Sequence, residues 1–328
     1  MQATTHASLD QVLLVIALGA YVVAALAFFA YLFSRDEWLK HLAIPLTIAG
    51  CVAQFAQLIA RFELTGIWPL LNLYGSLSLF AAMSVVIFVV FAFRYKLWFA
   101  GGFVLAIAAI AVAYGVTWNE GTMPAVPSLQ SYWAKIHVPL VVTSYAAFLL
   151  SFVISGLYLM KYYFEQNLGS RSVGLSPAAA TAGDGSMQFS AAYSGVRISA
   201  VRADTPNIAA AAAQGNTLAL WLNTLPGLAQ LDVLIYRAVA VGLPLLTLGI
   251  ITGAMWAHEA WGAYWQWDPK ETAALFSWII YASYMHLHTR NQWRGVRSSW
   301  VSVIGFLSIV FCYLGVNIWI SGLHSYKM

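Results

Sequence analysis

Long apolar runs alternate with short polar interruptions along most of the chain. Each run has about the 20 residues that a helix needs to cross a bilayer, so the pattern predicts eight membrane-spanning helices. We place them near residues 10–33, 42–60, 72–93, 97–117, 138–160, 236–256, 270–288 and 299–320. The predicted fold class is therefore all-α, a polytopic transmembrane helical bundle.

Two long connections divide the chain into parts. Residues 118–137 are rich in Pro, Gly and polar groups. Residues 169–217 carry Ala, Ser, Gly and scattered polar groups, which cannot bury enough surface to offset their chain entropy. We therefore expect helices one to five in residues 1–168, a disordered cytoplasmic linker in 169–217, and helices six to eight in residues 218–328.

The positions of Lys and Arg predict the orientation, because cytoplasmic loops retain positive charge. Most of the 16 Lys and Arg residues fall in the loops of one side, which we assign to the cytoplasm. Both termini, the loop 118–137 and the loop 256–269 should then face outside. The first eleven residues lack the Lys or Arg of a cleaved signal peptide, so we expect the first span to be retained.

Composition excludes several other classes of protein. Hydrophobic residues make up 61% of the chain and charged residues 9%, with a mean hydropathy of +0.74, which excludes a soluble globular protein. The net charge of +4 gives little support to nucleic-acid binding. Cys51 and Cys312 lie in apolar runs without a C-x-x-C motif, so we expect neither a disulfide scaffold nor a thiolate metal site.

The loop 256–269 is dense in aromatic residues. Five of the twelve residues from 256 to 267 are aromatic, namely Trp256, Trp261, Tyr264, Trp265 and Trp267. An interfacial belt explains one or two such rings, whereas five favour a flat apolar platform for a planar ligand such as a porphyrin. Asp268, Pro269 and Glu271 then predict a capping box that fixes the start of the next helix.

Histidines supply the candidate metal ligands. His286 lies 17 residues beyond that helix start, about 26 Å along the axis, and a histidine at such depth in a membrane has a functional role by default. His288 is the alternative. His137 and His324 both fall on the outer side, where water could explain either alone. Beside the aromatic loop, however, the pair suits the fifth and sixth positions of a haem iron.

The run from Trp261 to Thr272 resembles the WWD signature of haem-handling cytochrome c biogenesis proteins, and the chain most resembles their CcsA (ResC) type of system II. Other stretches of the chain also resemble that family. They are Asn72-Leu73-Tyr74 with Ser76-Leu77, Leu129-Gln130-Ser131 before His137, Ser144-Tyr145-Ala146, Gly315-Val316-Asn317 and Gly322-Leu323-His324-Ser325-Tyr326. The resemblance covers most of the chain outside the linker.

The resemblance implies a haem-delivering subunit of a cytochrome c synthase, a haem lyase that presents reduced haem b for attachment to C-x-x-C-H of apocytochrome c. His137 and His324 match the external haem ligands, and His286 matches the transmembrane ligand, with His288 leaving that assignment open. The tryptophan loop with Asp268 matches the haem-holding domain. No side chain is assigned as acid or base, since catalysis rests on positioning and redox protection.

The same resemblance implies a CcsB (ResB) type membrane partner that supplies a second transmembrane ligand, and a thiol-reducing thioredoxin-like protein. A bacterial cytoplasmic membrane fits best, with the thylakoid as an alternative. Lys135 and Arg61 are possible partners of haem propionates, although interfacial anchoring is the simpler interpretation of both. Alternative functions are a haem exporter that serves a separate ligase, and a b-type electron-transfer cytochrome.

Overall fold

The computed structural model describes residues 2–66, 68–70, 72–118, 131–173, 208 and 215–320. Every regular element within these ranges is a helix, which confirms the all-α class. The chain divides into two compact units, Met1–Tyr158 with Gly227–Met328, and Leu159–Pro226. The first unit contains the membrane helices that position the candidate site.

All eight predicted spans are helical. The helices are α1 (Gln2–Ser34), α2 (Glu37–Thr65), α3 (Leu73–Tyr95), α4 (Gly101–Val116) with the short η1 (Trp98–Ala100) before it, α5 (Tyr132–Val173), α7 (Thr217–Leu222), α8 (Leu228–Trp261), α9 (Pro269–His288), η3 (Asn291–Trp293), α10 (Val296–Val310), the π-helical η4 (Phe311–Gly315) and α11 (Val316–Trp319). Among the described residues, 7 helices are long and apolar enough to cross a membrane, so this is a membrane protein. The 20-residue α9 falls outside those seven because its Ser, Tyr and His residues lower its hydropathy.

Several helices are longer than the sequence predicted, since α1, α2, α5 and α8 all begin five or more residues earlier, and two of the later ends change the interpretation of the loops. Helix α8 continues through Trp261 and ends only at Gly262, whose φ of 80° is left-handed and whose N–H bonds to the His258 carbonyl. The first residues of the expected outer loop are therefore helical, and the loop is confined to residues 262–268. Helix α5 likewise extends to Val173, and most of the predicted linker 169–217 lies outside the described residues.

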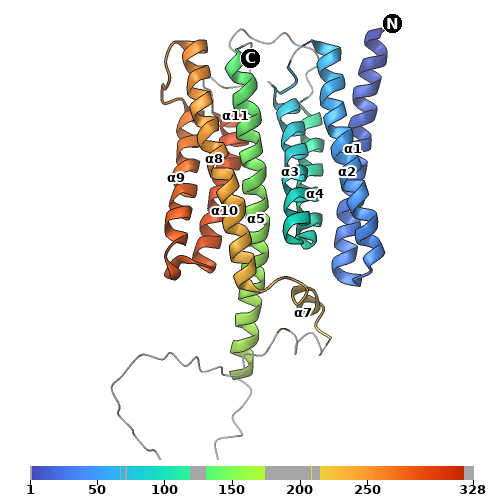
Figure 1. Cartoon of the computed structure of the whole chain (residues 1–328), viewed down its shortest axis with the longest axis vertical. Helices are drawn as coiled ribbons and strands as arrows, with labels where there is room; N and C mark the ends of the chain where they lie inside the picture. Colours follow the sequence, from blue (N-terminus) through green and yellow to red (C-terminus); the bar gives the residue numbers. More distant parts are fainter. Residues whose placement is uncertain are drawn as a thin grey trace, which may run out of the picture. The chain divides into compact units, whose positions relative to one another are not determined.

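Helices α1 to α4 form one group in the first unit, and α8 to α10 run alongside α5 (Figure 1). Small residues allow the close contacts between α5 and its neighbours. A Cβ atom added to Gly242 of α8 would lie 2.7 Å from the ring of Phe148, which in turn stacks on Tyr281 of α9 at 3.6 Å between centroids. The Ser302 hydroxyl of α10 donates to Ser151 of α5 at 3.1 Å. Such small-residue and hydroxyl contacts are the usual means of packing helices in a bilayer.

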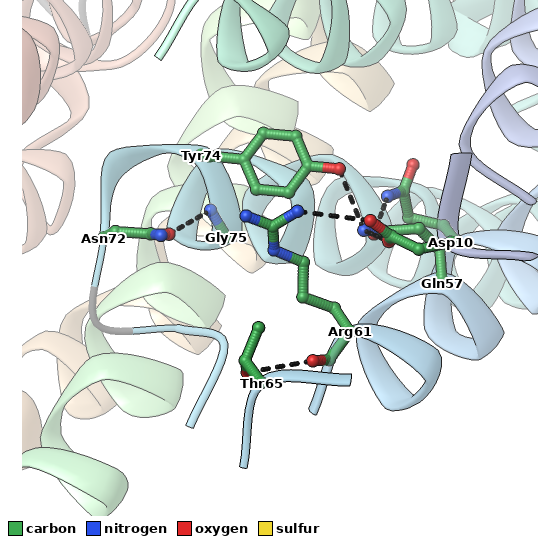
Figure 2. Close-up of polar contacts among 8 residues, drawn as sticks. Asp10, Gln57, Arg61, Thr65, Asn72, Tyr74 and Gly75 are labelled. Atoms are coloured by element: carbon green, nitrogen blue, oxygen red, sulfur yellow. Dashed lines mark hydrogen bonds and ion pairs between the residues drawn. The ribbon is translucent and has the colours of Figure 1, made fainter. Parts of the chain in front are cut away.

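A buried polar cluster joins α1, α2 and α3 (Figure 2). Arg61 donates to Asp10 at 3.2 Å and lies over the ring of Tyr74 at 4.5 Å. Gln57 donates to Asp10 at 2.5 Å and to the Tyr74 hydroxyl at 3.0 Å. Arg61 is only 7% exposed. It is therefore a structural cation buried between helices and not an interfacial anchor.

Removing one member of the Asp10–Arg61 ion pair is expected to destabilise the protein strongly. Arg61→Met leaves the Asp10 carboxylate buried without its cation, which should cost about 3–5 kcal/mol. The double variant Asp10→Leu with Arg61→Met removes both charges and should lie closer to wild type. Thermal unfolding of the purified protein, followed by a fluorogenic thiol reagent on Cys51 and Cys312, measures both effects.

Lys135→Met, which removes an exposed cation, is the matched control and should change stability by less than about 0.5 kcal/mol. Equal loss of stability in the single and double variants would contradict the role of the ion pair.

Candidate functional site: a histidine pocket beside the tryptophan loop

The start of α5 is tied to the end of α8. The Ser131 hydroxyl accepts from the Trp133 N–H at 3.1 Å and donates to the Glu259 carboxylate at 2.7 Å. The same oxygen therefore caps α5 and binds α8. This double contact fixes the first turns of α5, where His137 lies.

His137 is oriented by the backbone of α8. Its Nδ1 lies 2.8 Å from the carbonyl oxygen of Gly249, and a carbonyl can only accept, so Nδ1 carries the proton that it donates. A Cβ atom added to Gly253 would lie 2.8 Å from Nδ1 and Cε1 of this ring. The neutral imidazole thus keeps a lone pair on Nε2, the arrangement typical of metal-ligating histidines.

His137 lines a pocket of about 580 Å³, counted with the space on its open side. Its polar lining residues are His137, Tyr145, Tyr264, Trp265, Lys270 and Glu271, and its smaller or apolar ones are Val141, Leu246, Ile250, Gly253, Ala254, Ala274 and Cys312. Mostly apolar walls with a few polar groups are characteristic of small-molecule sites. The pocket therefore suits a large apolar ligand that offers a metal or a polar edge.

The aromatic residues of the signature form two groups. Trp256 is buried, packs beside His137 at 5.7 Å between ring centroids and meets Trp261 at an angle of 51°. Trp265 lines the pocket and meets Trp267 at 88°. Because these rings are steeply inclined, the prediction of one flat platform is wrong.

The inner group has a structural task. Trp256 and Ala134 are buried in contact with Trp68, Trp133 and Trp261, so residues from three separate loops or helix ends meet behind His137. Tyr264, by contrast, is exposed over the pocket rim and stacks on His258 at 4.2 Å. Trp256 and Trp261 thus support the wall that the loop builds, while the later rings reach the pocket and its surroundings.

The end of the loop is rigid. Trp267 has a φ of 58°, which is rare for a residue with a Cβ atom, and its side chain is 69% exposed. Asp268 then begins α9, and its carboxylate accepts from the Lys270 N–H at 3.1 Å. Glu271 accepts from the N–H groups of Gln266 and Asp268, which completes the predicted capping box. Asp268 is buried, and its carboxylate binds the first turn of α9.

The last membrane helix changes its winding at the level of the pocket. In η4 the Val316 N–H bonds to the Phe311 carbonyl, five residues back, and such π-helical turns are frequent at functional sites. Cys312 of this turn lines the pocket. Asn317, just beyond it, accepts from the Lys270 ammonium at 2.9 Å.

The other predicted ligands lie elsewhere. His324 falls outside the described residues. His286 is exposed on α9, whereas His288 is 6% exposed and its Nε2 lies 3.0 Å from the Asp232 carboxylate. The ring of His288 also stacks on Tyr236 at 4.8 Å. The two histidines of α9 therefore have different surroundings, and only His286 presents its side chain outward.

Sequence reasoning did not single out Lys270 as a pocket residue. A signal existed, because a cation in the first turn of a helix opposes the helix dipole and is rarely placed there for stability. Tyr145 and Glu271 were not foreseen as pocket residues either. Nothing in their local sequence distinguishes a wall from ordinary packing.

The fold and the site define a polytopic membrane protein that holds a histidine in a largely apolar pocket beside a tryptophan-rich loop. A family model described as cytochrome C assembly protein matches residues 70–324, and this chain belongs to that family, in its CcsA type. The resemblance found in the sequence is thereby confirmed. The chain is a membrane protein of cytochrome c biogenesis.

Curated relatives match over nearly their full length. The cytochrome c biogenesis protein CcsA of Porphyra purpurea is 34% identical, over 94% of this chain and 95% of the relative. The CcsA of Gloeobacter violaceus is 32% identical, over 93% and 92%. The solved structure of the cytochrome c haem lyase CcmF is similar in fold, with a TM-score of 0.60 at 14% identity, and the chain spans 94% of its own length but 46% of that chain.

The capping box predicts a measurable effect of Asp268. Asp268→Ala removes the acceptor of the Lys270 N–H and should cost about 1 kcal/mol, roughly 2 °C in the thermal midpoint. Asp268→Asn keeps a side-chain oxygen and should lose only part of this. If both variants lost the same stability, the charge of Asp268 and not its capping contact would be responsible.

Proposed function

We propose that this chain is the haem-presenting subunit of a cytochrome c synthase, in which haem b is the cargo. The observation that carries the proposal is the orientation of His137, whose Nδ1 bonds to the Gly249 carbonyl while the ring lines the pocket beside the tryptophan loop. A histidine held in this way offers Nε2 to an iron at no further cost of orientation.

The pocket supports a porphyrin as ligand. Val141, Leu246 and Ile250 give it aliphatic walls, which would shield a bound iron from water. His324, in the segment matched by the family model, would supply the second axial ligand in this proposal.

The reaction in this proposal is the addition of two cysteine thiols across the two vinyl groups of haem. Each addition breaks one S–H bond and the π bond of one vinyl group and forms one C–S and one C–H bond, so it is redox-neutral for haem and thiol together. Reduced iron and reduced thiols must therefore be present beforehand, which requires a thiol-reducing, thioredoxin-like partner for apocytochrome c. The chain's own part is to place the haem and to protect its iron.

His286 supports a second contact with haem at a surface shared with a CcsB-type partner. One face of α9 is exposed along its length, through Thr272, Phe276, Ile279, Ser283 and His286. These residues follow the helical spacing of a single stripe. A histidine on such a stripe is costly against lipid, so a partner helix that brings its own histidine would complete an iron site there.

His288 is less suited to this role. Asp232, which bonds to it, also accepts from the Gly295 N–H at 3.0 Å and from the Ser298 hydroxyl at 3.2 Å. The His288–Asp232 pair therefore joins α8, α9 and the start of α10. We assign His288 to the packing of this end of the helices and His286 to the shared haem site, near the cytoplasmic side.

The outer site is tested by visible absorption of the protein purified with a co-expressed CcsB-type partner, oxidised and then reduced. His137→Gly should lower the bound six-coordinate haem by about tenfold or more, and added imidazole should restore it. Gly253→Ala, which displaces the same ring, should cause a smaller loss. His41→Gly is the control, because His41 is exposed on α2 and does not line the pocket.

Unchanged haem content and unchanged cytochrome maturation in His137→Gly would contradict the assignment of this ligand. Haem attachment by the chain and its partner alone would exclude the alternative function of a haem exporter that serves a separate ligase.

The two histidines of α9 should respond differently. His286→Gly should reduce haem bound at the shared site without lowering the thermal midpoint, since its side chain is exposed. His288→Ala should instead destabilise the fold by about 1–3 kcal/mol, because the buried Asp232 carboxylate loses one of its three hydrogen-bond partners. The reverse pattern, with haem lost only from His288→Ala at unchanged stability, would transfer the ligand role to His288.

A further inference from the structure

The side of the pocket formed by α9 carries hydrogen-bond donors. Lys270 and Trp265 both line the pocket. The indole Nε1 of Trp265 is buried and has no hydrogen-bond partner among the residues that the structure describes. A buried N–H without an acceptor is costly, so this atom indicates a ligand that brings an acceptor.

Lys270 is held in place by a neutral group. Its ammonium donates to the Asn317 Oδ1 at 2.9 Å, and Asn317, only 4% exposed, donates in turn to the Tyr313 carbonyl at 2.5 Å. The amide oxygen accepts from the ammonium and so orients it within the pocket wall. The carboxylates of Asp268 and Glu271 next to it accept from backbone N–H groups of the capping box.

The position of Lys270 also favours an anion. It lies at the second residue of α9, where the helix dipole adds a partial positive charge. A lysine there weakens the helix, whereas a carboxylate ligand would be attracted by both charges. The π-helical turn η4 ends two residues before Asn317 and so sets where the ammonium is held.

The two other cations considered from the sequence are less suitable. Arg61 is bound to Asp10 inside the α1–α3 cluster, and Lys135 is exposed on α5 and does not line the pocket. Lys270 shares the pocket with His137 but comes from a different helix. One ligand can therefore meet the imidazole with its metal and the ammonium with a carboxylate at its edge.

We propose that Lys270, oriented by Asn317, and the indole N–H of Trp265 bind a carboxylate at the edge of the pocket ligand, which for haem is a propionate. This assignment rests on the proposed function of the pocket. It implies that the pocket fixes the rotation of the porphyrin in its plane as well as its iron. Asn317 is a positioning residue, since it acts through Lys270.

The test compares two probes, haemin and its dimethyl ester, which lacks the free carboxylates. Both are titrated into the full-length protein in lipid nanodiscs, with binding followed in the Soret band. Lys270→Met should weaken haemin binding about tenfold or more and leave the ester nearly unchanged. Trp265→Phe should cause a smaller loss in the same direction, and Lys270→Arg should restore much of the affinity.

Lys135→Met is the matched control, because it removes a lysine outside the pocket and should alter neither probe. Asn317→Leu should weaken haemin more than the ester, as expected if it orients Lys270. Equal weakening of both probes by Lys270→Met, or no weakening, would overturn the carboxylate assignment while haem binding itself stands. Failure of the wild-type protein to bind either probe in a His137-dependent manner would overturn both proposals.

Discussion

The close approach of α5 and α8 is the contact on which the site depends. Gly242, Gly249 and Gly253 of α8 face Phe148, Val141 and His137 of α5. Hydrocarbon offers helices no hydrophobic drive to associate, so small residues that let backbones meet supply dispersion contacts instead. The same approach brings the His137 ring to the Gly249 carbonyl. The same face of α8 thus sets both the packing against α5 and the tautomer of His137.

Buried hydrogen-bonded pairs that include a carboxylate fix how the other helices are rotated. Asp10 with Arg61 joins α1 and α2, and Asp232 with His288 joins α8 and α9. Such pairs add little net stability, but an unpaired member is costly, so wrong rotations are disfavoured. A shift of one residue along α9 would turn its side chains by about 100°. The Asp232 contact therefore determines which face of α9 is outward, and with it the exposure of His286.

The sequence was sufficient for the helices and for the capping box, because apolar runs of about 20 residues and the Asp268–Glu271 spacing are local signals. It was insufficient for the end of α8, for the arrangement of the tryptophan rings and for the choice between His286 and His288. The run of apolar residues in α8 ends near His258 and Glu259, yet the helix continues until Gly262 supplies a left-handed turn. Trp256 and Trp261 pack with Trp68 and Trp133 from other parts of the chain, and local sequence does not reveal such contacts. Likewise, the choice between His286 and His288 depends on Asp232, 56 residues earlier than His288.

The two histidines assigned to haem have opposite surroundings, and this difference bears on the direction of transfer. His137 lies inside the helix group, with its ring orientation fixed and with walls from α5, α8 and α9 around one pocket. His286 lies on an exposed face, so in the proposed complex its site exists only while a second chain supplies the other ligand. A site shared between chains loses affinity whenever either chain moves, whereas a preorganised pocket does not. In the proposed function, this difference in preorganisation would favour passage of haem from the shared site to the pocket.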